Sequence, residues 1–192
     1  MRALVVFAHP CEESFSAALK DVVVGRLAAR GWQVDLCDLY AEGFDPVLTA
    51  EERRAYHDIP GNTAPVAAHV DRLRAAEALI FVYPTWNFGF PAILKGYIDR
   101  VFLPGVSFVL KDGLVAPGLR HIRKLAVVTS YGATPFRAWA AGNPPKRYVT
   151  RVLRYISRPD RLRYLALYDM NRANDARRRA FLARVAAEMD RL

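Results

Sequence analysis

An aromatic loop directly follows one of the most apolar segments of the chain. Residues 78–83 are all apolar, and the sequence Tyr83-Pro84-Thr85-Trp86-Asn87-Phe88-Gly89-Phe90-Pro91 runs on from them. Rings, an amide and backbone N–H groups thus follow the carboxyl end of a predicted strand, where ligands bind in α/β sheets. This combination suits a flat, conjugated ligand that forms hydrogen bonds. The alternative is an ordinary strand-to-helix connection whose aromatic side chains only fill space.

Two other loops combine polar side chains with the end of an apolar segment. His9 follows the apolar residues 3–8, and Ser14 and Ser16 lie where the next helix is expected to begin. A helix N-terminus has unpaired N–H groups and a positive dipole end, so this loop suits a phosphate. Taken alone, this loop is better explained by Ser14 as a helix cap and His9 as a residue at the end of a strand. The third loop, Thr129-Ser130-Tyr131-Gly132, ends a later apolar segment with a polar turn.

These loops need a fold that places them, and the chain alternates strand and helix patterns. The patterns predict strands at 3–8, 32–39, 78–83, 124–130 and 164–168, with helices at 14–30, 66–76, 93–102, 146–158 and 175–192 and a short capped helix after Thr49. Such alternation predicts a doubly wound α/β fold with a five-stranded parallel sheet. Because G-x-G-x-x-G is absent after the first strand, we expect the flavodoxin-like strand order 2-1-3-4-5. No repeat or linker interrupts the pattern, so residues 1–192 are predicted to form a single domain.

In that strand order the three loops meet in one crevice, because strands one, three and four are neighbours. The first loop suits a phosphate, the second an aromatic ring, and the third the polar edge of a ring that needs N–H donors. Together they predict a flavin site. FMN is the preferred cofactor, since the chain is short and shows no separate feature for an adenine, and FAD is the alternative.

Several motifs give the chain a resemblance to a known family. They are His9, Ser14-Phe15-Ser16, Asp38-Leu39-Tyr40, Phe44-Asp45-Pro46, Tyr83-Pro84, Trp86, Phe88-Gly89, Pro91-Ala92-Ile93-Leu94-Lys95-Gly96, Asp99-Arg100-Val101-Phe102 and Thr129-Ser130-Tyr131-Gly132, with a weaker echo at Tyr168-Asp169-Met170. With them the chain resembles the NAD(P)H:quinone oxidoreductases of the DT-diaphorase type, above all their short bacterial members. The resemblance implies a flavodoxin-like homodimer with FMN or FAD, which transfers a hydride from NAD(P)H to a quinone in a ping-pong cycle.

The short bacterial members include ancillary proteins of potassium efflux systems. The resemblance therefore implies a second possible role, as a flavin- or nucleotide-binding regulatory subunit of a membrane ion-efflux system. The two roles do not exclude one another.

The resemblance also implies residue roles around the flavin. His9, Ser14, Phe15 and Ser16 would hold its phosphate and ribityl chain. Pro84, Thr85, Trp86, Asn87 and Phe88 would line the ring, and Thr129, Ser130, Tyr131 and Gly132 would contact its polar edge. Backbone N–H groups at Tyr131 and Gly132 are the candidates for the catalytic stabilisation of negative charge. The Tyr and His that diaphorases have after this turn are replaced by Ala133-Thr134-Pro135-Phe136-Arg137, so their proton-relay role does not transfer.

The cysteines and histidines outside these loops are not predicted to do chemistry. Cys37 falls in the second predicted strand and is expected in the core, and Cys11 is expected to be inert. His57, His69 and His121 have no ligand spacing along the chain, so the sequence predicts no metal site.

Positive charge is concentrated near the carboxyl end. Residues 146–192 have 13 Lys and Arg against 5 Asp and Glu, which supplies +8 of the net +9. A helix over 146–158 would align four arginines on one exposed face, Arg147, Arg151, Arg154 and Arg158, and bury Tyr148, Val149, Val152, Leu153 and Ile156. A solvated face is the simplest explanation. The alternatives are NAD(P)H phosphates or peripheral contact with a membrane protein or lipid, and no recognition motif favours nucleic acid.

The hydropathy of the chain and its first residues indicate in which cellular compartment the protein is expected. The longest apolar runs, such as 78–83, are far shorter than a membrane span, and the apolar segment 3–8 is followed by His9-Pro10 without a secretory cleavage pattern. We therefore expect a cytoplasmic protein without an integral membrane segment.

Overall fold

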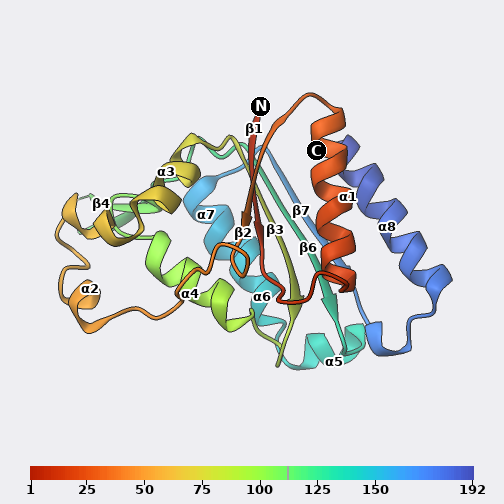
Figure 1. Ribbon diagram of the computed structural model, residues 1–192. Helices are drawn as coiled ribbons and strands as arrows, with labels where there is room; N and C mark the ends of the chain where they lie inside the picture. Colours follow the sequence, from red (N-terminus) through yellow and green to blue (C-terminus); the bar gives the residue numbers. More distant parts are fainter. Residues whose placement is uncertain (112) are drawn as a thin grey trace.

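A parallel five-stranded sheet forms the centre of the computed structural model, which describes residues 1–111 and 113–192. Its strands are β1 Arg2–Phe7, β2 Gln33–Asp38, β3 Ala78–Thr85, β6 Lys124–Tyr131 and β7 Arg161–Leu167. They are ordered β2-β1-β3-β6-β7, and every neighbouring pair is parallel. The predicted flavodoxin-like order 2-1-3-4-5 is therefore confirmed (Figure 1).

Helices cover both faces of this sheet, as crossover connections require. Helices α1 (Phe15–Ala29) and α8 (Asp175–Asp190) lie side by side on one face (Figure 1). The other face is covered by α3 (Ala67–Ala75), α4 (Ala92–Val101) and α7 (Arg154–Ser157). The remaining elements are α2 Ala50–Arg54, α5 Pro135–Ala140, α6 Pro144–Arg147, the 3₁₀ helices Gly61–Val66 and Met170–Arg172, the π-helix Tyr148–Leu153, and the antiparallel hairpin β4 Phe108–Lys111 with β5 Leu114–Pro117.

The strands are apolar throughout because both of their faces are buried. Along β3, Ile80 and Val82 pack toward α1 and α8, while Phe81 and Tyr83 pack toward α3 and α4. Two separate cores thus form, one on each side of the sheet. This explains why the first, third and fourth predicted strands show continuous hydrophobicity rather than alternation.

Local signals in the sequence set several helix boundaries. The Ser14 hydroxyl accepts a hydrogen bond from the N–H of Ala17 at 3.1 Å and begins α1. Thr49 and Glu52 form the predicted capping box of α2. Pro91 takes the N-cap position of α4, one residue earlier than the first-turn position expected from the sequence.

One predicted helix differs from expectation. Residues 144–157 are helical, but the middle section, Tyr148–Leu153, is a π-helix. Because a π-helix has i→i+5 hydrogen bonds, the side chains that follow it are rotated about the helix axis relative to their positions in an α-helix. Val149, Leu153 and Ile156 are buried as predicted, whereas Val152 is 44% exposed, so its predicted burial is wrong. The four arginines of the predicted face are all exposed.

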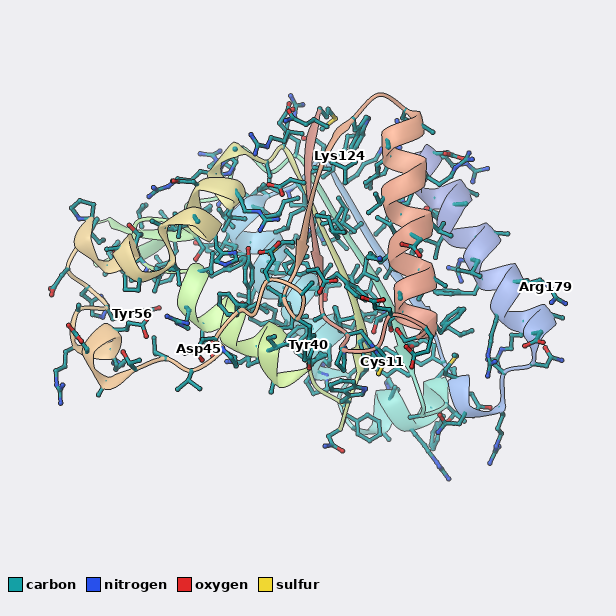
Figure 2. The ribbon with its side chains drawn as sticks, viewed as in Figure 1. Cys11, Tyr40, Asp45, Tyr56, Lys124 and Arg179 are labelled. Atoms are coloured by element: carbon teal, nitrogen blue, oxygen red, sulfur yellow. The ribbon has the colours of Figure 1, made fainter. Side chains whose placement is uncertain are left out.

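The two ends of the strands lie at opposite edges of the sheet. The carboxyl ends of β1, β3 and β6 share one edge, and Figure 2 shows Cys11 near this edge and Lys124, which begins β6, at the other. Among the described residues, no helix is long and apolar enough to cross a membrane.

Candidate cofactor site

Three loops leave neighbouring strands at this edge. Phe7 of β1 pairs with Val82 of β3, and Thr85, the last residue of β3, pairs with Tyr131, the last of β6. The loops after these strands are therefore adjacent, as the sequence predicted. Ring contact supports this, because the edge of the His9 imidazole meets Trp86 with centroids 5.8 Å apart.

The loop after β3 is a tight turn with an uncommon backbone. Trp86 and Gly89 exchange both backbone hydrogen bonds, at 3.2 and 2.8 Å, and φ is +48° at Asn87 and +57° at Phe88. Positive φ at both central positions is the pattern of a type I′ turn, which usually requires Gly or Asn. Phe88 is thus held in a conformation that a bulky side chain rarely adopts, and such strain concentrates at ligand sites.

This turn exposes groups that a ring-shaped ligand can use. The side chains of Trp86 and Phe88 are 41% and 36% exposed. Within the described part of the chain, the N–H groups of Asn87 and Phe88 donate to no protein acceptor. The turn therefore offers two aromatic surfaces and two free backbone donors at one place.

A cavity of about 560 Å³ joins the second loop to the third. Four of the predicted ring-lining residues and two of the predicted edge residues border it, namely Pro84, Thr85, Trp86, Asn87, Ser130 and Gly132. Met170 and Asn171, in the 3₁₀ helix after β7, complete the lining. The sequence analysis did not predict this pair, and its only signal was the weak motif ending at Met170.

Gly132 lies close to the Asn171 side chain. A Cβ atom at residue 132 would lie 3.1 Å from the Asn171 amide nitrogen, tighter than ordinary van der Waals contact. A side chain at residue 132 would therefore require the exposed Asn171 amide to shift by a few tenths of an ångström.

The loop after β1 contains the donors expected of a phosphate site. His9 Nδ1 accepts a hydrogen bond from the N–H of Cys11 at 3.0 Å, which places the proton of a neutral ring on Nε2. At the start of α1, Ser14 caps the helix, and no acceptor for the N–H groups of Phe15 and Ser16 is found in the described residues. The Phe15 ring packs toward Phe181 of α8, with centroids 6.4 Å apart, so only its backbone is free for a ligand.

Two predicted edge residues direct their side chains into the protein interior. The Tyr131 hydroxyl donates to Asn143 Oδ1 at 2.8 Å and lies 2.5 Å from the Tyr164 hydroxyl. Burial raises the pKa of Tyr131, so the hydroxyl is neutral at neutral pH. Thr129 is fully buried, with its hydroxyl 3.1 Å from that of Thr85. Tyr131 can therefore serve a ligand through its backbone, and its hydroxyl is part of the fold.

The donor set fits a flavin. A helix N-terminus with two free N–H groups suits the phosphate, exposed aromatic surfaces suit the ring, and the Ser130–Gly132 backbone suits a carbonyl edge. Trp86 of the second group and Ser130 and Gly132 of the third border one cavity, which Phe88 and Tyr131 do not line. The His9–Trp86 contact joins the first group to the second.

Comparison with known proteins agrees with this architecture. Residues 1–191 match the profile of a protein family described as having a flavodoxin-like fold. The chain belongs to this family. Among solved structures, Smu.1420 from Streptococcus mutans has a TM-score of 0.88 and 29% identity, with all of both chains covered.

Two curated relatives are quinone dehydrogenases by name. NAD(P)H dehydrogenase [quinone] 1 of Rattus norvegicus is 35% identical over 150 residues, which are 69% of this chain and 54% of the relative. Ribosyldihydronicotinamide dehydrogenase [quinone] of Homo sapiens is 31% identical over 166 residues, which are 77% of this chain and 71% of the relative. The aligned part is thus about half the length of the rat protein.

Sequence reasoning also missed a group of possible metal ligands away from this cavity. Cys37, Glu42 and His69 come from β2, the turn after it and α3, and their ligand atoms all lie within 4.8 Å of one another. Spacing along the chain could not reveal a group whose members are brought together by tertiary packing. Cys37 itself is fully buried, as the prediction of a core position required.

Proposed function

We propose that the protein is a flavin-dependent NAD(P)H oxidoreductase that delivers a hydride to a quinone-type acceptor. The main support is the cavity where the loops after β3 and β6 meet, beside a strained aromatic turn with two free N–H donors. The printed names of the rat and human relatives support the same reaction class. When bound, the flavin supplies the hydride-transfer chemistry.

The residues of the chain would bind and orient this cofactor. His9 Nε2 and the N–H groups at the start of α1 would hold the phosphate. Ser16 is only 3% exposed, so it would contribute through its N–H group rather than the hydroxyl predicted from the sequence. Trp86 and Phe88 would contact the ring, and the Asn87 and Phe88 N–H groups would donate to its edge. FMN is preferred over FAD, since the described site shows no separate place for an adenine.

The turn after β6 would stabilise negative charge. Tyr131 is the last residue of β6 and is held there by its hydroxyl, which is bonded to Asn143, and Gly132 follows it directly. Fixed dipoles need no reorganisation when charge develops, which is why such donors are effective in catalysis.

Flavin binding and turnover test this proposal. The purified protein should show the visible absorption of a bound flavin, and mass analysis after denaturation should identify FMN. It should oxidise NADH or NADPH when a quinone is present. Trp86→Ala with Phe88→Ala should weaken flavin binding by more than about tenfold. Removing one aromatic side chain that stacks on a nucleobase costs about 1–3 kcal/mol of binding free energy, and a similar loss is expected for a flavin ring. Tyr155→Ala, at a ring that is 46% exposed and outside the cavity, is the matched control.

A protein that neither contains nor binds flavin at micromolar concentration would rule out the assignment. If flavin binds but no quinone is reduced, the site stands and the acceptor class is wrong. If the double variant binds as tightly as the parent, the loop after β3 has no role in holding the ring.

We also propose a homodimer. Phe136 and Trp139 of α5 are each 72% exposed, with ring centroids 5.9 Å apart, and α5 follows the cavity turn directly. Exposed aromatic pairs are typical anchors of interfaces. Light scattering should return twice the 21.6 kDa monomer mass, and Phe136→Ser with Trp139→Ser should return the monomer mass.

A regulatory role in an ion-efflux system is the second candidate. The exposed arginines Arg147, Arg151, Arg154 and Arg158 favour an anionic partner surface. Charge reversal at Arg151 and Arg154 should leave quinone reduction unchanged and abolish partner or vesicle binding if this role is correct. A raised KM for NAD(P)H with unchanged kcat would instead assign the face to the nucleotide.

A further inference from the structure

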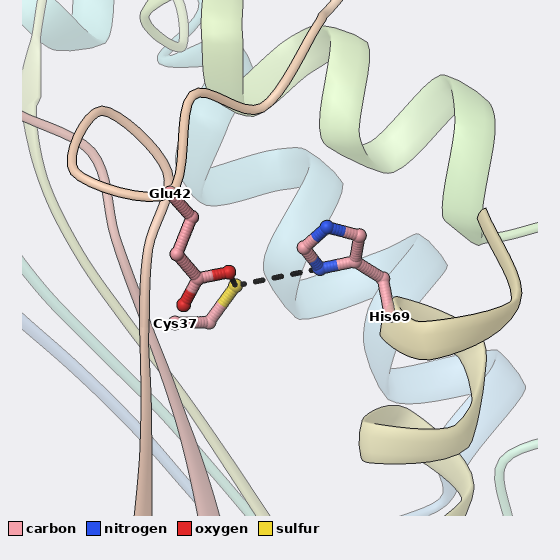
Figure 3. A group of neighbouring side chains, drawn as sticks. All are labelled: Cys37, Glu42 and His69. Carbon is pink, nitrogen blue, oxygen red and sulfur yellow. Dashed lines mark hydrogen bonds between the residues drawn. The ribbon is translucent and has the colours of Figure 1, made fainter.

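The cluster of Cys37, Glu42 and His69 has the composition of a zinc site. Figure 3 shows the Cys37 sulfur between the Glu42 carboxylate and the His69 ring. Cys37 Sγ lies 3.7 Å from Glu42 Oε2 and 3.7 Å from His69 Nδ1. Bond lengths of about 2.3 Å to sulfur and 2.0 Å to nitrogen place tetrahedral ligand atoms about 3.5 Å apart. The observed separations are close to that value.

The surroundings fix these ligands in place. Arg72 Nη1 donates to both Glu42 oxygens, at 2.9 and 2.7 Å, and the same guanidinium bonds Asp35. A carboxylate held in this way is oriented by its outer partner, as metal-binding carboxylates usually are. The His69 ring is held between Phe44 and Tyr97, with centroids 4.9 and 5.6 Å away.

A second, independent observation points to a missing group at this place. Tyr97 is fully buried, and its hydroxyl has no hydrogen-bond partner in the described residues. The Tyr97 ring contacts the His69 ring with centroids 5.6 Å apart, so Tyr97 lies beside the cluster. A buried hydroxyl without a partner is unfavourable, and a bound water or ion would satisfy it.

We propose that Cys37, Glu42 and His69 bind one Zn²⁺ ion, with a water molecule in the fourth position that hydrogen-bonds the Tyr97 hydroxyl. Sulfur, imidazole and carboxylate together select zinc among the common divalent cations. On binding, the Cys37 thiol loses its proton to solvent and becomes a thiolate. The zinc dication balances this new negative charge. Arg72 cannot do so, because it is already bonded to two carboxylates. Access is available from the side of Glu42, which is 33% exposed.

The ion would have a structural role. It would join β2, the turn that follows β2, and α3 at one point. The same turn contributes Tyr40 and Ala41 to a cavity of about 440 Å³ that His9 also borders. Zinc would therefore stiffen a segment next to the predicted phosphate loop.

Zinc titration of the full chain tests the inference. After dialysis against a chelator, the protein should bind one equivalent from zinc chloride, measured by competition with a chromophoric indicator. Cys37→Ser and His69→Gln should each weaken binding by more than about 100-fold, and Tyr97→Phe by about tenfold. Cys11→Ser and His57→Gln are matched controls outside the cluster, and both should bind as the parent does.

Cobalt substitution identifies the sulfur ligand directly. Cobalt chloride should give a thiolate-to-metal absorption band that is present in Cys11→Ser and absent in Cys37→Ser. If circular dichroism shows that Cys37→Ser is unfolded, the zinc affinity of His69→Gln and the cobalt band of the parent protein still decide whether the cluster binds a metal. No stoichiometric zinc binding in the parent, or binding unaffected in both ligand variants, would overturn the proposal and leave a hydrogen-bonded thiol.

Discussion

The two faces of the sheet are packed with different chemistry. The face toward α1 and α8 is almost entirely aliphatic, with Val5, Ile80 and Val128 from the strands against Leu19, Val23, Val185 and Met189 from the helices. The face toward α3 and α4 contains buried phenol, imidazole and thiol groups, including Tyr83, Tyr97, His69 and Cys37. The first face stabilises the fold through buried apolar area and close packing alone. The second face must also provide hydrogen-bond partners for its buried polar groups.

The difference in packing indicates which face can hold functional polar groups. An aliphatic layer must be closely packed, but its side chains need no hydrogen-bond partners in fixed directions. A layer with buried polar groups is retained only if each group has a partner. The Tyr131 hydroxyl, bonded to Asn143 and Tyr164, and the Tyr97 hydroxyl, which has no protein partner in the described residues, are the two outcomes on this face.

The largest expected effect lies on the aliphatic face. Ile80→Ala removes a fully buried side chain between β3 and the α1–α8 pair, so the free energy of unfolding should fall by about 3–4 kcal/mol. Urea denaturation measures this loss. Val47→Ala, at a side chain that is 62% exposed, is the control and should change stability by less than about 0.5 kcal/mol. A loss below 1 kcal/mol at Ile80 would show that this face repacks freely, and the comparison of faces would fail.

The next largest effect on stability comes from replacing a glycine by alanine in one helix on each face of the sheet. In α4, a Cβ at Gly96 would lie 2.3 Å from the Cβ and carbonyl oxygen of Pro46, so Gly96→Ala should destabilise the fold by about 2–3 kcal/mol. In α1, nothing lies within 4 Å of such an atom at Gly25, so Gly25→Ala should stabilise by about 0.5–1 kcal/mol. Thermal unfolding of the two variants checks both signs. Equal signs would contradict the close packing of α4 on the segment before α2.

Much of this fold could be predicted from the sequence because its signals are local. Continuous apolar runs marked β1, β3 and β6, and Ser14 and Thr49 marked helix starts. The loops of the candidate site could be predicted too, because parallel strands bring their carboxyl ends to one edge.

The rest depends on packing between distant segments. Met170 and Asn171 reach the cavity only because β7 returns beside β6. Cys37, Glu42 and His69 meet only because α3 packs beside β2. The π-helix that exposes Val152 has no local sequence signature.

Among the polar groups, Tyr131→Phe should have an intermediate effect. Removing its hydroxyl leaves Asn143 and Tyr164 short of a partner, which should lower the free energy of unfolding by about 1–2 kcal/mol. Flavin affinity should not change, because the hydroxyl points into the interior. Denaturation and flavin titration of the same sample separate the two quantities. Weaker flavin binding with normal stability would mean that this hydroxyl belongs to the site.

The smallest expected loss of stability is that of Tyr97→Phe. The hydroxyl has no protein partner in the described residues, so its removal from zinc-free protein should not lower the free energy of unfolding and should raise it by up to about 1–3 kcal/mol, the cost of an unsatisfied buried hydroxyl. Saturating zinc chloride should then stabilise the parent more than the variant, because only the parent can hold the water on the metal. Parallel thermal melts with and without zinc measure this difference. A loss near that of Tyr131→Phe in zinc-free protein would show that the Tyr97 hydroxyl is already satisfied, which would remove the second observation behind the zinc site. The two tyrosines, alike in burial and differing in partners, thus decide whether this face contains one completed polar network or two.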